Sequence, residues 1–180
     1  MFERILGEEE FAKVYPILAA AFPETELRTR EGQAALLRRE GYRLYGFKEA
    51  DGEYFAVIAA WELAEDFIYL EHFAVAENKR NGGIGGALLE EFLAWYGRKA
   101  VLEVEVPEDE LTKRRVGFYQ RHGFYYNEYP YLQPPMRPGQ GMLPLRLMTR
   151  PTPIGETAYQ RYRELIHRQV YRYFGTAEEK

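Results

Sequence analysis

The chain has 180 residues, of which 46% are hydrophobic and 29% are charged, and its formal net charge at pH 7 is −4. This length and composition are typical of one globular domain, and the acidic balance offers no basic stripe for nucleic acid. The chain has no cysteine, which excludes disulfides, thiolate nucleophiles and cysteine–zinc sites, and we expect no metal site. No apolar run approaches the length of a membrane span and the acidic start, MFERILGEEEF, lacks the plan of a signal peptide, so we expect a cytoplasmic protein without a membrane partner.

The first part of the chain predicts two helices followed by a hairpin. Apolar residues recur at helical spacing from Glu8 to Ala21, where Pro16 should kink or split the helix. A second helix is expected over residues 29–40. The period then changes to that of strands in residues 42–63, where Asp51-Gly52 marks a hairpin turn.

The middle of the chain alternates strands with helices. Residues Phe67 to Val75 are apolar on both faces, which is typical of a strand inside a covered sheet. A glycine-rich stretch and a helix follow, and then a strand from Ala100 to Val106. Because a helix separates these two strands, we expect them to be parallel neighbours. A short helix from Leu111 to Arg121 comes next.

The last part predicts two strands and a long helix. One strand starts at the residues FYY, a Pro/Gly-rich loop follows, and Leu143 to Arg150 form a last strand that Pro144 would restrict to a sheet edge. Residues Glu156 to Phe174 have helical spacing, with arginines on a solvated face.

These elements predict a mixed α/β (α+β) fold. Its single, mostly antiparallel sheet should have about six to seven strands and a central parallel pair, with helices on its flanks. We expect residues 1–150 to form the domain and residues 151–180 to form a C-terminal helical extension of it.

The stretch ENKRNGGIGGALLEEF places four glycines within five positions at the start of a helix. Free backbone N–H groups and the positive end of the helix dipole meet there, and glycines let an anion approach them. Lys79 and Arg80 add positive charge, so a phosphate or pyrophosphate is the natural ligand. The stretch lacks the Gly-Lys-Ser/Thr of a Walker A loop, and Leu88 stands where a dinucleotide fingerprint has its third glycine. The alternative is a glycine-rich turn that binds nothing.

The run Arg80-Asn81-Gly82-Gly83-Ile84-Gly85-Gly86 resembles the acyl-CoA pyrophosphate loop of the GNAT superfamily of N-acetyltransferases. In that superfamily the loop follows a strand that ends as Phe73-Ala74-Val75 does here. The run RRVGFYQRHGF, from Arg114 to Phe124, resembles the second signature of the superfamily, and the strong resemblance covers about residues 67–126.

The resemblance implies that acetyl-CoA is the donor and that the two central strands splay apart to admit its pantetheine arm. The main chain of Phe73 and Val75 would contact that arm. The acceptor amine would attack the thioester carbonyl directly, which agrees with the absence of a cysteine nucleophile. The pyrophosphate would lie on the amides of Gly83, Ile84, Gly85 and Gly86, with Arg80 near the phosphates and with Asn81 and Gly82 in the same loop.

Two proton transfers remain, and the resemblance assigns the first to Tyr119. This residue stands where many superfamily members have the tyrosine that protonates the leaving thiolate. A phenol is a sensible donor, because its ordinary pKa of about 10 lies above that of a thiol, about 8.5. The alternative is a core tyrosine that is anchored by one hydrogen bond.

The general base has two candidates. Glu71 interrupts an apolar strand, and partial burial should raise its pKa toward a useful range. Glu103 matches a glutamate that serves as base in ribosomal-protein alanine acetyltransferases, and it shares a strand face with Glu105. The alternatives are a carboxylate paired with an arginine, a base acting through water, or no dedicated base. We expect His72 to point away from Glu71 and to pack against a helix, and His167 to lie at the surface.

The acceptor is expected to be the primary amine of a small molecule or a peptide, bound by a monomer or a homodimer. A second hypothesis is a non-catalytic acyl-CoA-binding domain that acts as a sensor or regulator. A third is transfer to a hydroxyl group, or use of a longer acyl chain. Four tyrosines in or beside the late loop would line the acceptor pocket or simply cover the sheet edge: Tyr125, Tyr126, Tyr129 and Tyr131.

Overall fold

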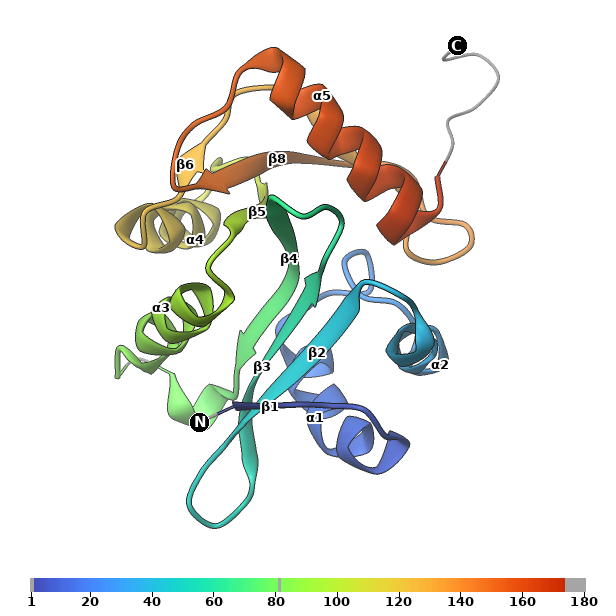
Figure 1. Cartoon of the computed structure of the whole chain (residues 1–180), viewed down its shortest axis with the longest axis vertical. Coiled ribbons are helices and arrows are strands. Elements are labelled where there is room, and N and C mark those ends of the chain that lie inside the picture. The colour runs from blue at the N-terminus through green and yellow to red at the C-terminus, as the bar shows by residue number, and fades with distance from the viewer. Residues whose placement is uncertain (1, 81, 174–180) are drawn as a thin grey trace. The chain divides into compact units, whose positions relative to one another are not determined.

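The computed structural model describes residues 2–80 and 82–173. The chain divides into two compact units, residues 1–100 and residues 101–180 (Figure 1). The predicted separation of residues 151–180 as an extension of one domain stays a prediction.

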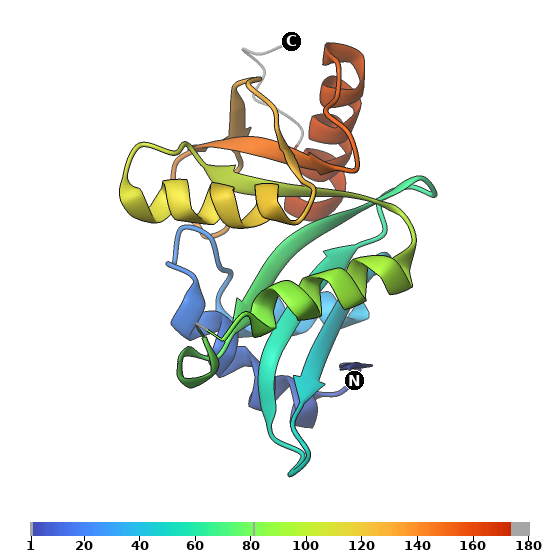
Figure 2. The same cartoon turned by 90° about the vertical axis from the view of Figure 1, so that its left-hand side faces the viewer.

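The first unit is an antiparallel sheet with helices on both of its faces. Its elements are β1 (Phe2–Arg4), α1 (Glu8–Ala21), α2 (Arg30–Ala35), the 3-10 turn η1 (Leu36–Arg38), β2 (Tyr42–Lys48), β3 (Tyr54–Trp61), β4 (Phe67–Val75), the 3-10 turn η2 (Glu77–Lys79) and α3 (Ile84–Tyr96). The strands pair in the order β1-β2-β3-β4. Helices α1 and α2 lie over one face of this sheet, and α3 lies over the other (Figures 1 and 2).

Both helices predicted in the first part of the chain are found, but each differs in detail from the prediction. Helix α1 has the predicted bounds, and Pro16 lies within it without splitting it. Thr29 caps α2 by accepting a hydrogen bond from the Gly32 N–H at 3.1 Å. The helix predicted over residues 29–40 then tightens into η1, so its last part is a 3-10 turn.

The predicted hairpin is confirmed between β2 and β3. Gly52 adopts a φ of +90°, which glycine tolerates without strain, and the Asp51 carboxylate accepts a hydrogen bond from the Glu53 N–H at 3.0 Å. Sequence analysis missed β1, because three residues are too few to show a strand period.

The second unit surrounds a central strand. Its elements are β5 (Lys99–Glu105), which begins in the last two residues of the first unit, α4 (Glu110–Arg121), β6 (Tyr125–Tyr126), β7 (Tyr131–Gln133), β8 (Leu143–Arg150), α5 (Glu156–Leu165) and the π-helical turn η3 (Ile166–Tyr171). The strands follow the order β5-β8-β6, and β7 also pairs with β8. Helices α4 and α5 lie on opposite faces of β8 (Figure 2).

The predicted edge position of β8 is wrong, because β8 has a neighbour on each side. Pro144 is tolerated as the second residue of the strand, where it lies opposite Leu132 of β7. A proline removes only one N–H from the ladder, so a position near a strand end limits the loss.

The predicted mixed α/β class, with mostly antiparallel strands and flanking helices, is confirmed. The described residues form eight strands rather than six or seven, because the three-residue β1 and β7 are too short to show a strand period. The parallel pairing predicted for the two central strands stays a prediction. The C-terminal helix starts at Glu156 as predicted and continues to Tyr171, and the predicted end at Phe174 lies outside the described residues.

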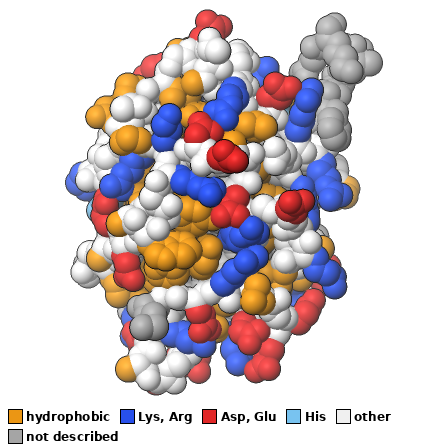
Figure 3. Space-filling model, in the orientation of Figure 1, with side chains coloured by type: hydrophobic (Ala, Val, Ile, Leu, Met, Phe, Trp, Pro, Cys, Tyr) orange, Lys and Arg blue, Asp and Glu red, His pale blue; other side chains and the backbone are white. Residues whose placement is uncertain are grey.

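The surface carries both signs of charge. Figure 3 shows Lys and Arg side chains interspersed with Asp and Glu on the face that it presents, without a basic stripe. Among the described helices, none is long and apolar enough to cross a membrane. Within residues 2–80 and 82–173, no group of three or more His, Asp or Glu side chains could hold a metal ion.

The core of the first unit gives a direct test of packing. Leu18 in α1 has no exposed surface, whereas Leu6 just before α1 is 68% exposed. Leu18→Ala should therefore lower the free energy of unfolding by about 2–5 kcal/mol. Leu6→Ala, the same chemical change, should stay within about 0.5 kcal/mol. Urea unfolding measures both, and equal losses would contradict the assigned position of α1.

Candidate active site

The segment between β4 and α3 builds a helix N-terminus that no side chain caps. Gly83 is the N-cap residue, with a left-handed φ of +75°, and the first turn of α3 holds no acidic residue. The first amides of a helix have no carbonyl partner in the preceding turn. Those of Ile84, Gly85 and Gly86 are therefore donors at the positive end of the helix dipole.

The glycines of this loop differ in what surrounds them. A Cβ atom at Gly82 or Gly83 would meet no atom within 4 Å. At Gly85 it would lie 3.6 Å from the Val75 side chain and 3.9 Å from the ring of Phe73. Gly82 and Gly83 thus leave space that a ligand can enter, whereas Gly85 lets α3 lie close to the end of β4. The predicted loop residue Asn81 lies outside the described residues.

The two basic residues of the loop have different partners. Lys79 forms an ion pair with Glu49, with 2.7 Å between Nζ and Oε1. Arg80 donates from Nε to the Val75 carbonyl at 2.8 Å, which ties the loop to the end of β4. In the part of the chain that the structure describes, no carboxylate pairs with Arg80. Outward amides, open space and an unbalanced guanidinium together fit an anion such as a pyrophosphate.

A β-bulge in β4 changes the predicted orientation of its side chains. Ala59 lies opposite His72 and Ala60 lies opposite Leu70, so Glu71 has no partner across the ladder. A bulge interrupts the regular alternation of a strand. As a result, the His72 Nδ1 atom lies 3.9 Å from the Glu71 Oε2 atom, and the prediction that the two point to opposite faces is wrong.

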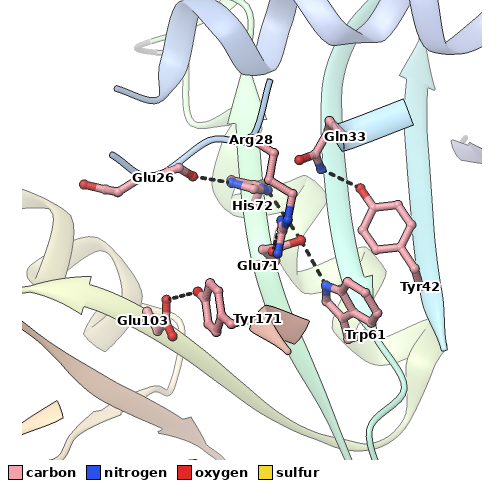
Figure 4. Close-up of polar contacts among 9 residues, drawn as sticks. All are labelled: Glu26, Arg28, Gln33, Tyr42, Trp61, Glu71, His72, Glu103 and Tyr171. Carbon is pink, nitrogen blue, oxygen red and sulfur yellow. Dashed lines mark hydrogen bonds and ion pairs between the residues drawn. The ribbon is translucent and has the colours of Figure 1, made fainter. Parts of the chain in front are cut away.

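The Glu71 carboxylate is enclosed and paired (Figure 4). Its side chain has no exposed surface, and Arg28, from the segment between α1 and α2, places Nη1 2.5 Å from Oε1. Trp61 donates from Nε1 to Oε2 at 2.9 Å. Burial pushes the pKa of Glu71 upward, but the positive Arg28 and these contacts outweigh it, so the pKa lies below its ordinary value. The predicted rise of this pKa is wrong, because the sequence did not reveal Arg28 as the partner.

His72 is held as a neutral ring. Its Nε2 atom donates to the Glu26 carbonyl at 2.8 Å, since a carbonyl can only accept. Its Nδ1 atom is then a buried acceptor without a hydrogen-bond partner. Burial lowers the pKa of His72. The predicted packing is confirmed, because the ring meets the edge of Phe22 directly after α1, with 4.6 Å between centroids.

Tyr119 lies in the last part of α4, which starts at an Asp109 capping box. Its ring contacts Phe124 edge-on at 5.6 Å. No hydrogen bond to the hydroxyl is found within the described chain, and the oxygen is not among the buried polar atoms without a partner. Burial raises the pKa of Tyr119 to about 12, an effect that Arg115 opposes and Glu105 supports. The phenol is therefore protonated throughout the physiological range.

Glu103, on β5, is bound by two phenols. Tyr171 of η3 donates to Oε2 at 2.7 Å (Figure 4), and Tyr131 of β7 donates to Oε1. Glu105, two residues further along the strand, pairs with Arg115 of α4. The two carboxylates thus share a strand face but have different contacts: Glu105 pairs with an arginine, and Glu103 accepts hydrogen bonds from two tyrosines.

Three residues of these clusters were not predicted from the sequence: Arg28, Trp61 and Tyr171. A carboxylate in an apolar strand signals that a cation is needed, but it does not identify which arginine supplies it. His167, expected at the surface, packs its ring edge against Tyr131 at 5.4 Å, and burial lowers its pKa to about 4. The prediction of a surface position is wrong, because the ring of His167 packs among the rings of Tyr131, Tyr171 and Tyr173.

The Arg28–Glu71 pair should be costly to break. Arg28→Met leaves the enclosed Glu71 carboxylate without its cation and should lower the free energy of unfolding by about 3–5 kcal/mol. Adding Glu71→Gln removes the stranded charge and should recover much of this loss. The control is Arg168→Met, which breaks an exposed pair with Glu164 (61% and 57% exposed) and should cost about 1 kcal/mol or less.

The same pair sets a pH dependence. Because the folded-state pKa of Glu71 lies below the ordinary value of 4.5, its stabilisation is complete above that value and is lost as pH falls through the folded pKa. The difference in free energy of unfolding between wild type and Arg28→Met should therefore be smaller at pH 4 than at pH 7. Equal losses for Arg28→Met and Arg168→Met would refute the assigned pairing.

Comparison with known proteins identifies the family. A family model described as "Acetyltransferase (GNAT) family" matches residues 9–124. YjbC of Bacillus subtilis strain 168, which is classed as an acetyltransferase, is 31% identical over 112 residues, or 61% of this chain and 55% of that protein. The match therefore spans about half the length of this curated relative.

Two solved structures share the fold. One, from Bacteroides thetaiotaomicron and assigned as a GNAT-family acetyltransferase, is 34% identical with a TM-score of 0.87, covering 95% of this chain and 98% of that one. Another, a GNAT-family acetyltransferase from Elizabethkingia anophelis with acetyl-CoA bound, is 20% identical with a TM-score of 0.60, covering 83% of this chain and 95% of that one. On the family model and the similarity to the Bacteroides protein, this chain belongs to the GNAT family of acetyltransferases.

Proposed function

We propose that the protein is an acetyl-CoA-dependent N-acetyltransferase that transfers an acetyl group to a primary amine of a small molecule or a peptide, with both substrates bound at once. The observation that carries the proposal is the uncapped N-terminus of α3, with open space at Gly82 and Gly83 and an Arg80 guanidinium that no described carboxylate balances. The acetyl-CoA bound in the Elizabethkingia protein of the same fold supports this choice of donor.

The loop is proposed to hold the pyrophosphate of acetyl-CoA. Its amides would donate to the phosphate oxygens, and Arg80 would lie beside them. The main chain of Phe73 and Val75 is proposed to contact the pantetheine arm. The bond from Arg80 to the Val75 carbonyl would then fix the loop and the strand end together. The proposed amide donors are those of Gly82, Gly83, Ile84, Gly85 and Gly86, with Asn81 in the same loop.

In the proposed reaction the acceptor nitrogen forms a bond to the acetyl carbon as the carbon–sulfur bond breaks. The nitrogen loses a proton, and CoA leaves as a thiolate. Tyr119 would donate a hydrogen bond to that sulfur. A phenol with a pKa of about 12 is a weaker acid than a thiol with a pKa of about 8.5, so the hydroxyl would stabilise the thiolate and keep its own proton. The thiolate then equilibrates with solvent protons.

Glu103 is the proposed proton acceptor for the amine. Tyr131 and Tyr171 donate to its two oxygens as neutral hydroxyl groups, so these two contacts leave the carboxylate its negative charge. Glu71 is the second candidate, but it is enclosed and its pKa is lowered, both of which make it a weak base. We propose instead that Glu71 anchors Arg28 and, with it, the segment between α1 and α2 on the acceptor side.

A non-catalytic acyl-CoA sensor would use the same loop. It would bind acetyl-CoA but release no CoA when amines are added. The open hydroxyl of Tyr119 favours the enzyme, since a sensor has no thiolate to stabilise. Assays with acetyl-, propionyl- and succinyl-CoA, against amines and alcohols, would separate N-acetylation from transfer to a hydroxyl or use of a longer acyl chain.

The loop can be tested without disturbing the fold. Because a Cβ at Gly82 meets nothing within 4 Å, Gly82→Ala should keep its affinity for acetyl-CoA. Gly82→Asp puts a negative charge beside the proposed phosphates and should weaken binding by about tenfold or more. Calorimetric titration with acetyl-CoA measures both. If the folded wild type binds no acetyl-CoA, or if Gly82→Asp binds as well as Gly82→Ala, the pyrophosphate assignment is wrong.

Tyr119→Phe tests the hydroxyl in the reaction. Loss of a hydrogen bond to a charged sulfur should lower kcat about 10- to 100-fold while leaving the affinity for acetyl-CoA nearly unchanged. Tyr54→Phe is the matched control, because the Tyr54 hydroxyl donates to Glu3 instead. Steady-state assays of CoA release give kcat for both variants. An unchanged kcat in Tyr119→Phe would remove this residue from the mechanism.

A further inference from the structure

A groove lined by aromatic rings lies beside the edge strand of the first unit. Strand β1 is the end strand of the sheet, and within the described residues no strand lies on its other side (Figure 1). The groove has a volume of about 510 Å³, and its lining residues are Phe2, Arg4, Tyr45, Glu91 and Trp95. They belong to β1, β2 and α3, so the groove is built by one unit alone.

The regular geometry of these elements turns the lining side chains to one surface. Phe2 and Arg4 are two positions apart on β1 and therefore share a face of the strand. Arg4 lies opposite Tyr45 of β2, which puts both side chains on that same face. Glu91 and Trp95 are four positions apart on α3 and are neighbours on its surface.

Trp95 is a large apolar side chain that is held in place at the surface. It is 59% exposed, whereas Tyr45 beneath it is only 6% exposed. The Trp95 ring meets Phe2 edge-on at 5.2 Å and Tyr45 at 5.7 Å between centroids, and it also contacts Tyr96 at 5.3 Å. Tryptophan, tyrosine and arginine are the residues that most often carry the binding energy of protein interfaces. An aromatic surface of this kind, with charges beside it, is typical of a docking site.

The two charged residues of the groove have opposite signs. Arg4 and Glu91 are both exposed, and neither has an ion-pair partner among residues 2–80 and 82–173. Glu3, on the other face of β1, differs because Lys48 pairs with it at 2.6 Å. A partner surface of a single charge sign would match only one of Arg4 and Glu91. A second copy of the same groove offers one positive and one negative group and can match both.

We propose that this groove is the contact surface of a homodimer, in which a two-fold axis packs the Trp95 rings of two copies into the joined grooves and pairs Arg4 of each copy with Glu91 of the other. In such an interface, residue i contacts residue j and residue j contacts residue i, so each pair is formed twice. None of the five lining residues has a part in the proposed reaction. The inference therefore does not rest on the proposed function.

Sedimentation equilibrium of the full chain measures the association directly. At about 100 µM the wild type should approach twice the monomer mass of 21.2 kDa, and the mass should fall on dilution. Trp95→Ala removes the central ring and should weaken the association about 30-fold or more. The control is Leu111→Ala on α4, because Leu111 is likewise exposed, at 64%, but lies in the other unit. This variant should associate as the wild type does.

Charge reversal tests which residues meet across the interface. Arg4→Glu puts two carboxylates opposite each other, and Glu91→Arg puts two guanidinium groups opposite each other. Each variant should weaken the association about tenfold or more. The double variant Arg4→Glu/Glu91→Arg exchanges the two charges and should recover most of the loss. Because both side chains are exposed, circular dichroism and thermal unfolding of the single variants should show an intact fold.

Three outcomes would overturn the inference. A wild type that keeps the mass of one chain at about 100 µM forms no such dimer, and the groove is then left to a different partner. Equal association of Trp95→Ala and Leu111→Ala means that the copies meet through another surface. A double variant that associates no better than the single variants means that Arg4 and Glu91 do not face each other across a two-fold axis.

Discussion

An enclosed carboxylate must be paired, and the first unit is arranged around that requirement at Glu71. The bulge in β4 puts this residue outside the ladder, so its side chain is free to turn toward Arg28 and Trp61. Arg28 comes from the segment between α1 and α2, and Trp61 ends β3. One ion pair and one indole hydrogen bond therefore connect a loop with two strands. Removing water from a carboxylate costs free energy unless the group is paired. Arrangements of these segments that leave Glu71 unpaired are therefore disfavoured.

The carboxylates of Glu71 and Glu103 lie on different strands and have different kinds of partner, and this difference affects their chemistry. Arg28 balances Glu71 with a full positive charge, which lowers its pKa and leaves it little capacity to hold a proton. Glu103 is bound by phenols, which orient the charge without neutralising it. A proton acceptor needs a fixed position and an available charge together, and the enclosed ion pair with Arg28 makes the charge of Glu71 unavailable.

The sequence predicted most of the local structure but few of the contacts between segments that are distant along the chain. Helix α1, strand β4 and strand β8 have the predicted bounds, because each is long enough to show its period. The glycines of the loop also predicted the N-terminus of a helix. In contrast, the bulge at Glu71 depends on its pairing with β3, and the His167 ring of η3 is covered by Tyr131 of β7. Neither leaves a mark in local composition, so the facing of His72 and the burial of His167 were predicted wrongly.

The proposed binding sites for acetyl-CoA and for the acceptor amine differ in how far they can be recognised from the sequence. Main-chain amides bind phosphate wherever a helix starts after small residues, so the loop at Gly82 and Gly83 can be recognised from a few letters of sequence. Contacts between side chains of distant segments leave no such local pattern. Tyr131 and Tyr171 both donate to Glu103, although 40 positions separate them in the sequence. Each such contact follows from tertiary packing, and substitution of one residue changes the pocket without changing the fold.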